Sequence, residues 1–128
     1  MSTKLTNLLA KLDSALERLS EALARPKDDF IRDSAIHRFE FSFELFWKLL
    51  KAYSDYKGLK VFSPRDAIRS CFKLGLLSDD EVWLAMLEDR NRTSHTYDSA
   101  LADAIYAQLP VYHAAMLQVA AAVRDEFA

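Results

Sequence analysis

The densest cluster of reactive side chains lies between residues 89 and 98, where the sequence reads Asp-Arg-Asn-Arg-Thr-Ser-His-Thr-Tyr-Asp. A guanidinium such as that of Arg90 can hold a phosphodiester and stabilise the charge that builds on its oxygens. An imidazole such as that of His95 can move a proton near neutral pH. Together these groups suffice for RNA cleavage without a metal ion, because the ribose 2′-hydroxyl attacks its own phosphate.

The spacing of Arg90 and His95 constrains the structure around them. In a continuous helix, two residues five positions apart point about 140° away from each other. The two side chains therefore converge only if a helix ends between them, and the polar residues after Arg92 favour such an end. Alternatively, Arg90 pairs with Asp89 or Glu88, and His95 stabilises the last carbonyls of the helix.

A basic stripe on another segment is a second candidate for binding phosphates. Arg65, Arg69 and Lys73 are spaced four apart, which places them on one face of a helix. The alternative is that this stripe is only a solvated face. Supporting contacts near Arg90 are expected from polar neighbours in the same segment, namely Asn91, Arg92 and Ser94.

Composition excludes several other kinds of site. The chain of 128 residues has one cysteine and two glycines, so we expect neither an internal disulfide nor a phosphate-binding glycine loop. His37 and His113 lack the neighbours of a metal site, and no cofactor is predicted. No apolar run reaches the roughly 20 residues that span a bilayer, and no signal-peptide core is present, so we expect a cytoplasmic protein without membrane contact. With a net charge of −2, any contact to RNA has to come from a local basic patch.

The elements that position these residues are predicted to be helices within a single all-α domain, residues 1–128. Helix-forming residues dominate, and apolar residues recur at spacings of three and four. Capping residues and breakers then set the expected helices: Leu5 to before Pro26, about Phe30 to Lys57, Pro64 to Gly75, a capping box at Ser78–Glu81 to about Arg92, and Asp98 or Ser99 to near the C-terminus. Pro110 is expected to kink or restart the last of these.

The second helix is apolar on more than one side. A broad core face is predicted from Ile36, Phe39, Phe43, Phe46, Trp47, Leu50 and Tyr53. A second apolar stripe contains Phe41, Leu45, Leu49 and Ala52, while a narrow polar strip contains His37, Glu40, Glu44, Lys48 and Lys51. We expect the Phe41 stripe to contact another subunit, although the third helix is an alternative cover within the monomer.

The stretch from Ala35 to Lys51, followed by Arg90-Asn91-x-x-x-His95-x-Tyr97, resembles the nucleotidyltransferase substrate-binding branch of the HEPN superfamily. The resemblance covers nearly the whole chain. It implies an up-and-down antiparallel four-helix bundle with a short extra helix, which forms a homodimer and brings two Arg-x4-His sites together across a cleft.

The resemblance also implies a partner, a minimal nucleotidyltransferase, in a toxin–antitoxin pair. In some such pairs the HEPN member is a metal-independent ribonuclease, and the transferase silences it by adding AMP to a tyrosine. By this resemblance Arg90 orients the phosphate, His95 transfers a proton and Tyr97 accepts the nucleotide. The other implied function is a substrate-binding subunit without activity of its own.

Overall fold

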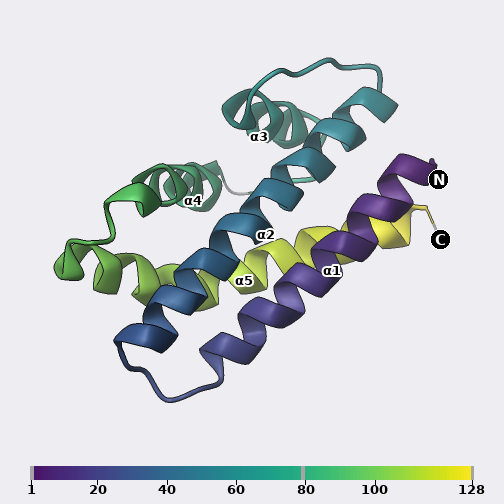
Figure 1. Cartoon of the computed structure of the whole chain (residues 1–128). Helices are drawn as coiled ribbons and strands as arrows, with labels where there is room; N and C mark the ends of the chain where they lie inside the picture. Colours follow the sequence, from purple (N-terminus) through teal and green to yellow (C-terminus); the bar gives the residue numbers. More distant parts are fainter. Residues whose placement is uncertain (1, 79, 128) are drawn as a thin grey trace.

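The computed structural model describes residues 2–78 and 80–127 and is helical throughout, without a strand in these residues (Figure 1). Five α-helices and one short 3-10 helix follow in order: α1 Thr3–Leu23, α2 Asp29–Tyr56, α3 Pro64–Lys73, α4 Asp80–Arg92, η1 Thr93–His95 and α5 Ser99–Glu126. The prediction of an all-α fold is confirmed. No helix within these residues is long and apolar enough to cross a membrane.

Local signals explain where most helices begin and end. The carboxylate of Asp28 accepts a hydrogen bond from the Ile31 amide at 2.7 Å and so caps α2. Ser63 caps α3, with Pro64 at the first helical position, and Asp98 caps α5. Gly58 and Gly75 follow α2 and α3 with φ of 87° and 81°, a conformation that favours glycine. The capping box predicted at the start of α4 includes residue 79, which lies outside the described residues.

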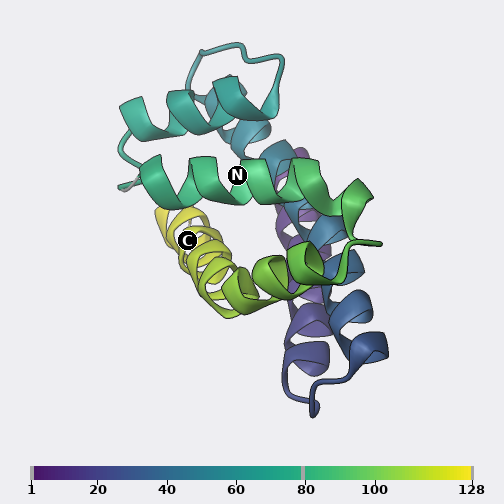
Figure 2. The ribbon, with the colours of Figure 1, turned by 90° about the vertical axis from the view of Figure 1, so that its left-hand side faces the viewer.

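The helices form a bundle around α2. The antiparallel pair α1 and α2 is crossed by α5, which packs against both, while α3 and α4 cover the remaining side of α2 (Figures 1 and 2). The short α3 is the extra helix of the predicted four-helix bundle. As predicted, α5 kinks near Pro110, but it does not restart there (Figure 2).

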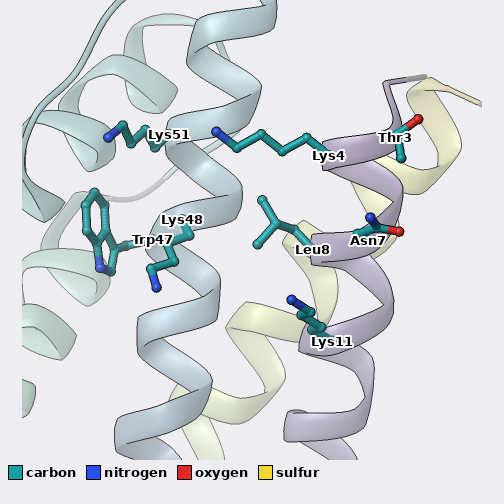
Figure 3. Close-up of a pocket in the computed structure, with 8 residues that line it drawn as sticks. All are labelled: Thr3, Lys4, Asn7, Leu8, Lys11, Trp47, Lys48 and Lys51. Carbon is teal, nitrogen blue, oxygen red and sulfur yellow. The ribbon is translucent and has the colours of Figure 1, made fainter.

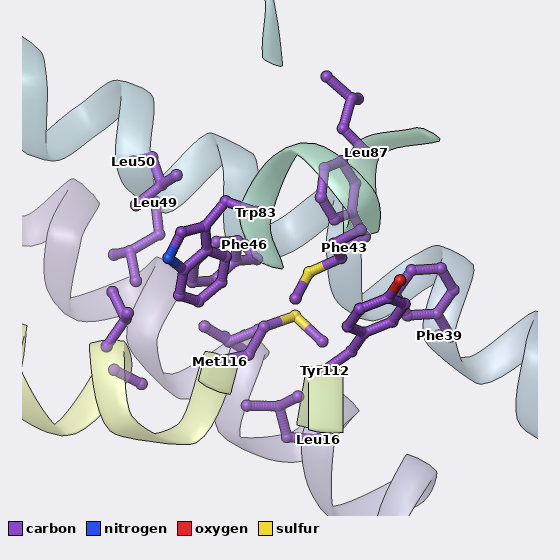
Figure 4. Close-up of a cluster of buried hydrophobic side chains, with 14 of the residues drawn as sticks. Leu16, Phe39, Phe43, Phe46, Leu49, Leu50, Trp83, Leu87, Tyr112 and Met116 are labelled. Atoms are coloured by element: carbon purple, nitrogen blue, oxygen red, sulfur yellow. The ribbon is translucent and has the colours of Figure 1, made fainter. Parts of the chain in front are cut away.

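Aromatic side chains of α2 fill the core and hold the neighbouring helices (Figure 4). Phe46 stacks on Trp83 of α4 at 5.1 Å between ring centroids, and Phe39 stacks on Tyr112 of α5 at 5.6 Å. Each fully buried large apolar side chain contributes about 1.5–3 kcal/mol through burial. Trp47 was predicted to belong to this core but is only half-buried, because it lies at the edge of the inner face and lines a surface groove.

The second apolar stripe of α2 lies largely inside the chain. Leu49 is fully buried, so the prediction that it contacts another subunit is wrong. Arg38, on the same face, donates a hydrogen bond to the Arg18 carbonyl of α1, which identifies α1 rather than the third helix as the cover. Leu45 and Phe41 are half-buried and keep part of their surface exposed.

Candidate functional site

The candidate site is built where α4 ends. The α-helix stops at Arg92 and is followed by the 3-10 turn Thr93–His95, so a helix does end between Arg90 and His95. Two hydroxyls hold this turn: Thr93 donates to the Arg90 carbonyl at 2.7 Å, and Thr96 donates to the Thr93 carbonyl at 3.0 Å. These bonds satisfy carbonyls that the ending helix leaves without a helical partner.

His95 and Tyr97 emerge from this turn into solvent. His95 is exposed, and 86% of the Tyr97 surface is accessible. The two rings meet edge to face, with centroids 6.1 Å apart. The imidazole and the phenol are therefore neighbours that a substrate or a second protein can reach together.

Arg90 is held by a carboxylate from another helix. Its Nη2 atom lies 3.4 Å from Oε2 of Glu44 on α2, and 41% of the Arg90 side chain stays exposed. An ion pair this exposed is worth about 0–1 kcal/mol. Since a guanidinium has five N–H donors, a phosphate can bind beside Glu44 or displace it.

The alternative that Arg90 pairs with Asp89 or Glu88 does not hold. Both carboxylates pair with Arg92 instead. Asp89 also accepts a hydrogen bond of 2.6 Å from the hydroxyl of Tyr112, which joins α4 to α5. Burial and the Asp89 charge raise the pKa of Tyr112 well above its usual range, so this hydroxyl remains a neutral donor.

The other predicted residues fall into two groups. Asn91 and Ser94 are exposed beside the site, as is Arg92. The basic stripe Arg65, Arg69 and Lys73 is exposed on α3, and residues 74–79 join its Lys73 end to the beginning of α4. Arg69 and Lys73 line a hollow together with Leu84 of α4, which lies six residues, about 9 Å, before Arg90 along that helix. The stripe is therefore a basic surface beside α4, outside the turn that carries His95.

Sequence reasoning did not assign Glu44, Asp89, Thr93 or Tyr112 to the site. Glu44 was assigned to the narrow polar strip of the second helix, where it pairs with Lys48 at 3.6 Å. No local pattern reveals that the same carboxylate also reaches Arg90 on α4. The cluster of hydroxyls after Arg92 was the available signal for the turn at Thr93.

Other reactive groups lie apart from this site. Cys71 is buried in the core, and burial raises the pKa of its thiol to about 11. Within residues 2–78 and 80–127, no three His, Cys, Asp or Glu side chains come together in an arrangement that can hold a metal ion.

The fold and the site define a helical-bundle domain with an Arg, a His and a Tyr displayed at the end of its fourth α-helix. This chain belongs to the family described as nucleotidyltransferase substrate binding protein like, whose model matches residues 4–125. The resemblance found in the sequence is thereby confirmed.

Known relatives agree with this assignment. A Haemophilus influenzae protein named probable ribonuclease HepT is 35% identical over 86 residues, which are 63% of this chain and 59% of the relative's length. A crystal structure of a Thermus thermophilus protein shares 41% identity with a TM-score of 0.83, and the match covers 88% of this chain and 98% of that one.

A second solved structure, from Haemophilus influenzae, shares 28% identity with a TM-score of 0.81, over 91% of this chain and 98% of that one. It was described as revealing the fold of a substrate binding domain of a nucleotidyltransferase. The two descriptions from Haemophilus influenzae, a probable ribonuclease and a substrate binding domain, correspond to the two functions that the sequence left open.

Proposed function

We propose that this chain is the HEPN component of a toxin–antitoxin pair and acts as a metal-independent endoribonuclease. The observation that carries the proposal is the turn after α4, which exposes His95 and Tyr97 two positions apart, five and seven positions after a half-exposed Arg90. Similarity to the probable ribonuclease HepT supports it.

In the proposed reaction, Arg90 binds the scissile phosphate through N–H groups that Glu44 leaves free. The ribose 2′-hydroxyl attacks the adjacent phosphorus, the bond from phosphorus to the 5′-oxygen breaks, and the products are a 2′,3′-cyclic phosphate and a 5′-hydroxyl. His95 takes the proton of the attacking hydroxyl or gives one to the departing oxygen. In a homodimer, the two copies of His95 divide these tasks between them.

The homodimer is part of the proposal, with Phe41 and Leu45 as its contact residues. Both keep exposed apolar surface on α2, whereas Leu49 is already covered by the chain itself. Phe41 makes an edge contact with the exposed ring of His37 at 5.5 Å. Burying this surface against a second copy provides the hydrophobic part of the contact.

Regulation is proposed to act at Tyr97. A cognate minimal nucleotidyltransferase transfers AMP from ATP to the Tyr97 hydroxyl, which its high exposure makes accessible. The tyrosyl oxygen bonds to the α-phosphorus, the hydroxyl gives up its proton, and pyrophosphate leaves. The attached nucleotide occupies the space beside His95 and brings a negative phosphate next to the RNA-binding groups. Cleavage then stops because RNA can no longer reach the site.

A second candidate function is a non-catalytic subunit that presents substrate to the nucleotidyltransferase. The ion pair between Arg90 and Glu44 favours it, because a carboxylate on the guanidinium competes with a phosphate. The description of the solved Haemophilus structure also favours it. In this case RNA is not cut, and the chain changes the affinity or activity of the transferase.

One experiment separates the two functions. Host cells express the chain alone, the His95→Ala variant, a His113→Gln control, or the chain together with a nucleotidyltransferase encoded beside it. Growth of each culture is followed, and the intact mass of each purified protein is measured by mass spectrometry. Growth arrest that His95→Ala or the transferase relieves, with an AMP-sized addition on Tyr97, supports the ribonuclease. Harmless, unmodified protein that still binds the transferase supports the substrate-binding subunit.

A further inference from the structure

A shallow groove of about 740 Å³ lies on the surface formed by α1 and α2 (Figure 3). Four lysines line it, Lys4, Lys11, Lys48 and Lys51, and none of its lining residues is acidic. Figure 3 shows Lys4 and Lys11 reaching from α1 toward α2, whereas Lys51 and Trp47 project from α2 on its other side. The groove therefore wraps over an exposed face of α2.

A second hollow of about 230 Å³ continues the first, because Lys4 and Lys51 line both. It adds Lys60 and the ring of Phe62, which is 81% exposed, and it contains one acid, Asp55. We call the two hollows together the lysine groove, with its lysines at positions 4, 11, 48, 51 and 60.

Charge is concentrated here in a chain whose net charge is −2. In the described part of the chain, the only ion pair of these five lysines joins Lys48 to Glu44. Lys51 lies over the Trp47 ring, 5.9 Å from its centroid, which is a cation–π contact. A surface with several cations and few counter-charges attracts a ligand that carries several negative charges.

Glu44 connects the lysine groove to the candidate site. Its carboxylate lies 3.4 Å from Arg90 of the candidate site and 3.6 Å from Lys48 of the lysine groove. The two cations therefore share one counter-ion. From Glu44, Lys51 lies about 10 Å further along the axis of α2. A strand whose phosphate binds at Arg90 can continue directly into the groove.

We infer that the lysine groove binds single-stranded RNA and guides it away from the phosphate held at Arg90. The lysines contact the backbone phosphates as flexible point charges, while Trp47 and Phe62 offer rings on which bases stack. Neither contact depends on base identity, so we expect the groove to bind RNAs of different sequence with similar affinity. This inference rests on the proposed function, since it names the substrate class and its path.

The test measures binding of fluorescently labelled oligouridylate to the full chain by anisotropy, in a His95→Ala background that leaves the RNA intact. The groove variant is Lys4→Glu with Lys51→Glu, which alters the two lysines common to both hollows. The matched control is Arg18→Glu with Arg25→Glu, which changes the same charge at exposed positions outside the groove.

We expect the groove variant to lose about tenfold or more in affinity, with a salt dependence flatter by about 1.4 in logarithmic slope for two lost phosphate contacts. Phe62→Ser is expected to lose about fivefold or more through lost stacking. Equal RNA affinity of the groove and control variants overturns the inference. It is also overturned if the groove variant keeps its RNA affinity and loses only the nucleotidyltransferase, because the groove then binds an acidic protein surface.

Failure of the proposed function gives a different result. In one such result, the chain with His95 intact does not cut RNA while the groove variant still loses RNA binding. That result supports RNA binding by the lysine groove and refutes the ribonuclease proposal. If the chain cuts RNA and the groove variant has an unchanged KM for RNA, the ribonuclease proposal is supported and RNA binding by the lysine groove is refuted.

Discussion

Arg90 on α4 and Glu44 on α2 form an ion pair of 3.4 Å within the candidate site. The pair fixes the guanidinium near the turn that carries His95, and it also places a negative charge where RNA phosphate is proposed to bind. The Glu44 carboxylate therefore both positions the Arg90 guanidinium and repels the RNA phosphate that is proposed to bind there.

Replacing that carboxylate tests which effect is larger. We expect Glu44→Gln to tighten RNA binding by up to about fivefold, since an exposed pair of this kind is worth about 0–1 kcal/mol. Anisotropy with the uncleaved oligonucleotide measures the change, with Glu40→Gln on the same polar strip as the control. Weaker binding than that of the control shows instead that Glu44 is needed to position Arg90.

His95→Ala is expected to lower RNA cleavage by about 10²- to 10⁴-fold, the usual contribution of a general acid or base. Because the His95 side chain is exposed, the free energy of unfolding should stay within about 0.5 kcal/mol of the original. Gel analysis of cleavage and urea unfolding measure the two quantities. Cleavage at the original rate by a well-folded variant contradicts the assigned role.

Tyr97→Phe removes the proposed acceptor hydroxyl and leaves the ring beside His95 in place. We expect this variant to cut RNA as the original does, to receive no AMP in co-expression, and to remain toxic beside the transferase. Intact mass and growth curves provide the measurement. An AMP-sized addition that persists in the variant places the modification on another residue.

Two tryptophans should respond differently to truncation. Trp83→Ala is expected to cost about 3–5 kcal/mol, since Trp83 is buried and stacks on Phe46. Trp47→Ala should cost less, because Trp47 is half-buried at the groove. Urea unfolding of both variants measures the difference in the free energy of unfolding, and equal losses contradict the different burial of the two side chains.

The pH dependence of stability should include a contribution from Asp103. Hydrogen bonds and charge from Lys27 and Arg32 lower the pKa of this carboxyl in the folded chain. Its stabilisation is therefore fully present above the unfolded pKa of about 3.9 and is lost as pH falls through the lower folded value. We expect Asp103→Asn to be less stable than the original at pH 7 and to match it in strong acid. Asp125→Asn, an exposed control, should change little at either pH.

Local signals in the sequence predicted most of the helices. Asp28, Ser63 and Asp98 cap helices because each side chain bonds amides within three residues, a relationship that spacing reveals. The helix end after Arg92 was predicted from the polar residues that follow it, and two of them, Thr93 and Thr96, bond carbonyls three residues away.

Relationships between distant residues were not predictable in this way. The cover of Leu49 by α1 depends on how two helices pack, and helical periodicity identifies an apolar face without identifying its neighbour. Lys4 and Lys51 line one groove although they are far apart in the chain. The pair between Glu44 and Arg90 is hidden for the same reason.

The turn Thr93–His95 has an evolutionary consequence. Its shape depends on hydrogen bonds of Thr93 and Thr96 to carbonyls within the same short segment, while the helices beneath it are held by the aromatic core. Substitutions on the exposed side of this turn can therefore accumulate in a lineage without unfolding the bundle. A gene duplicate can in this way change the chemistry of the exposed side chains, including those proposed to cleave RNA, through a few adjacent codons while the fold persists.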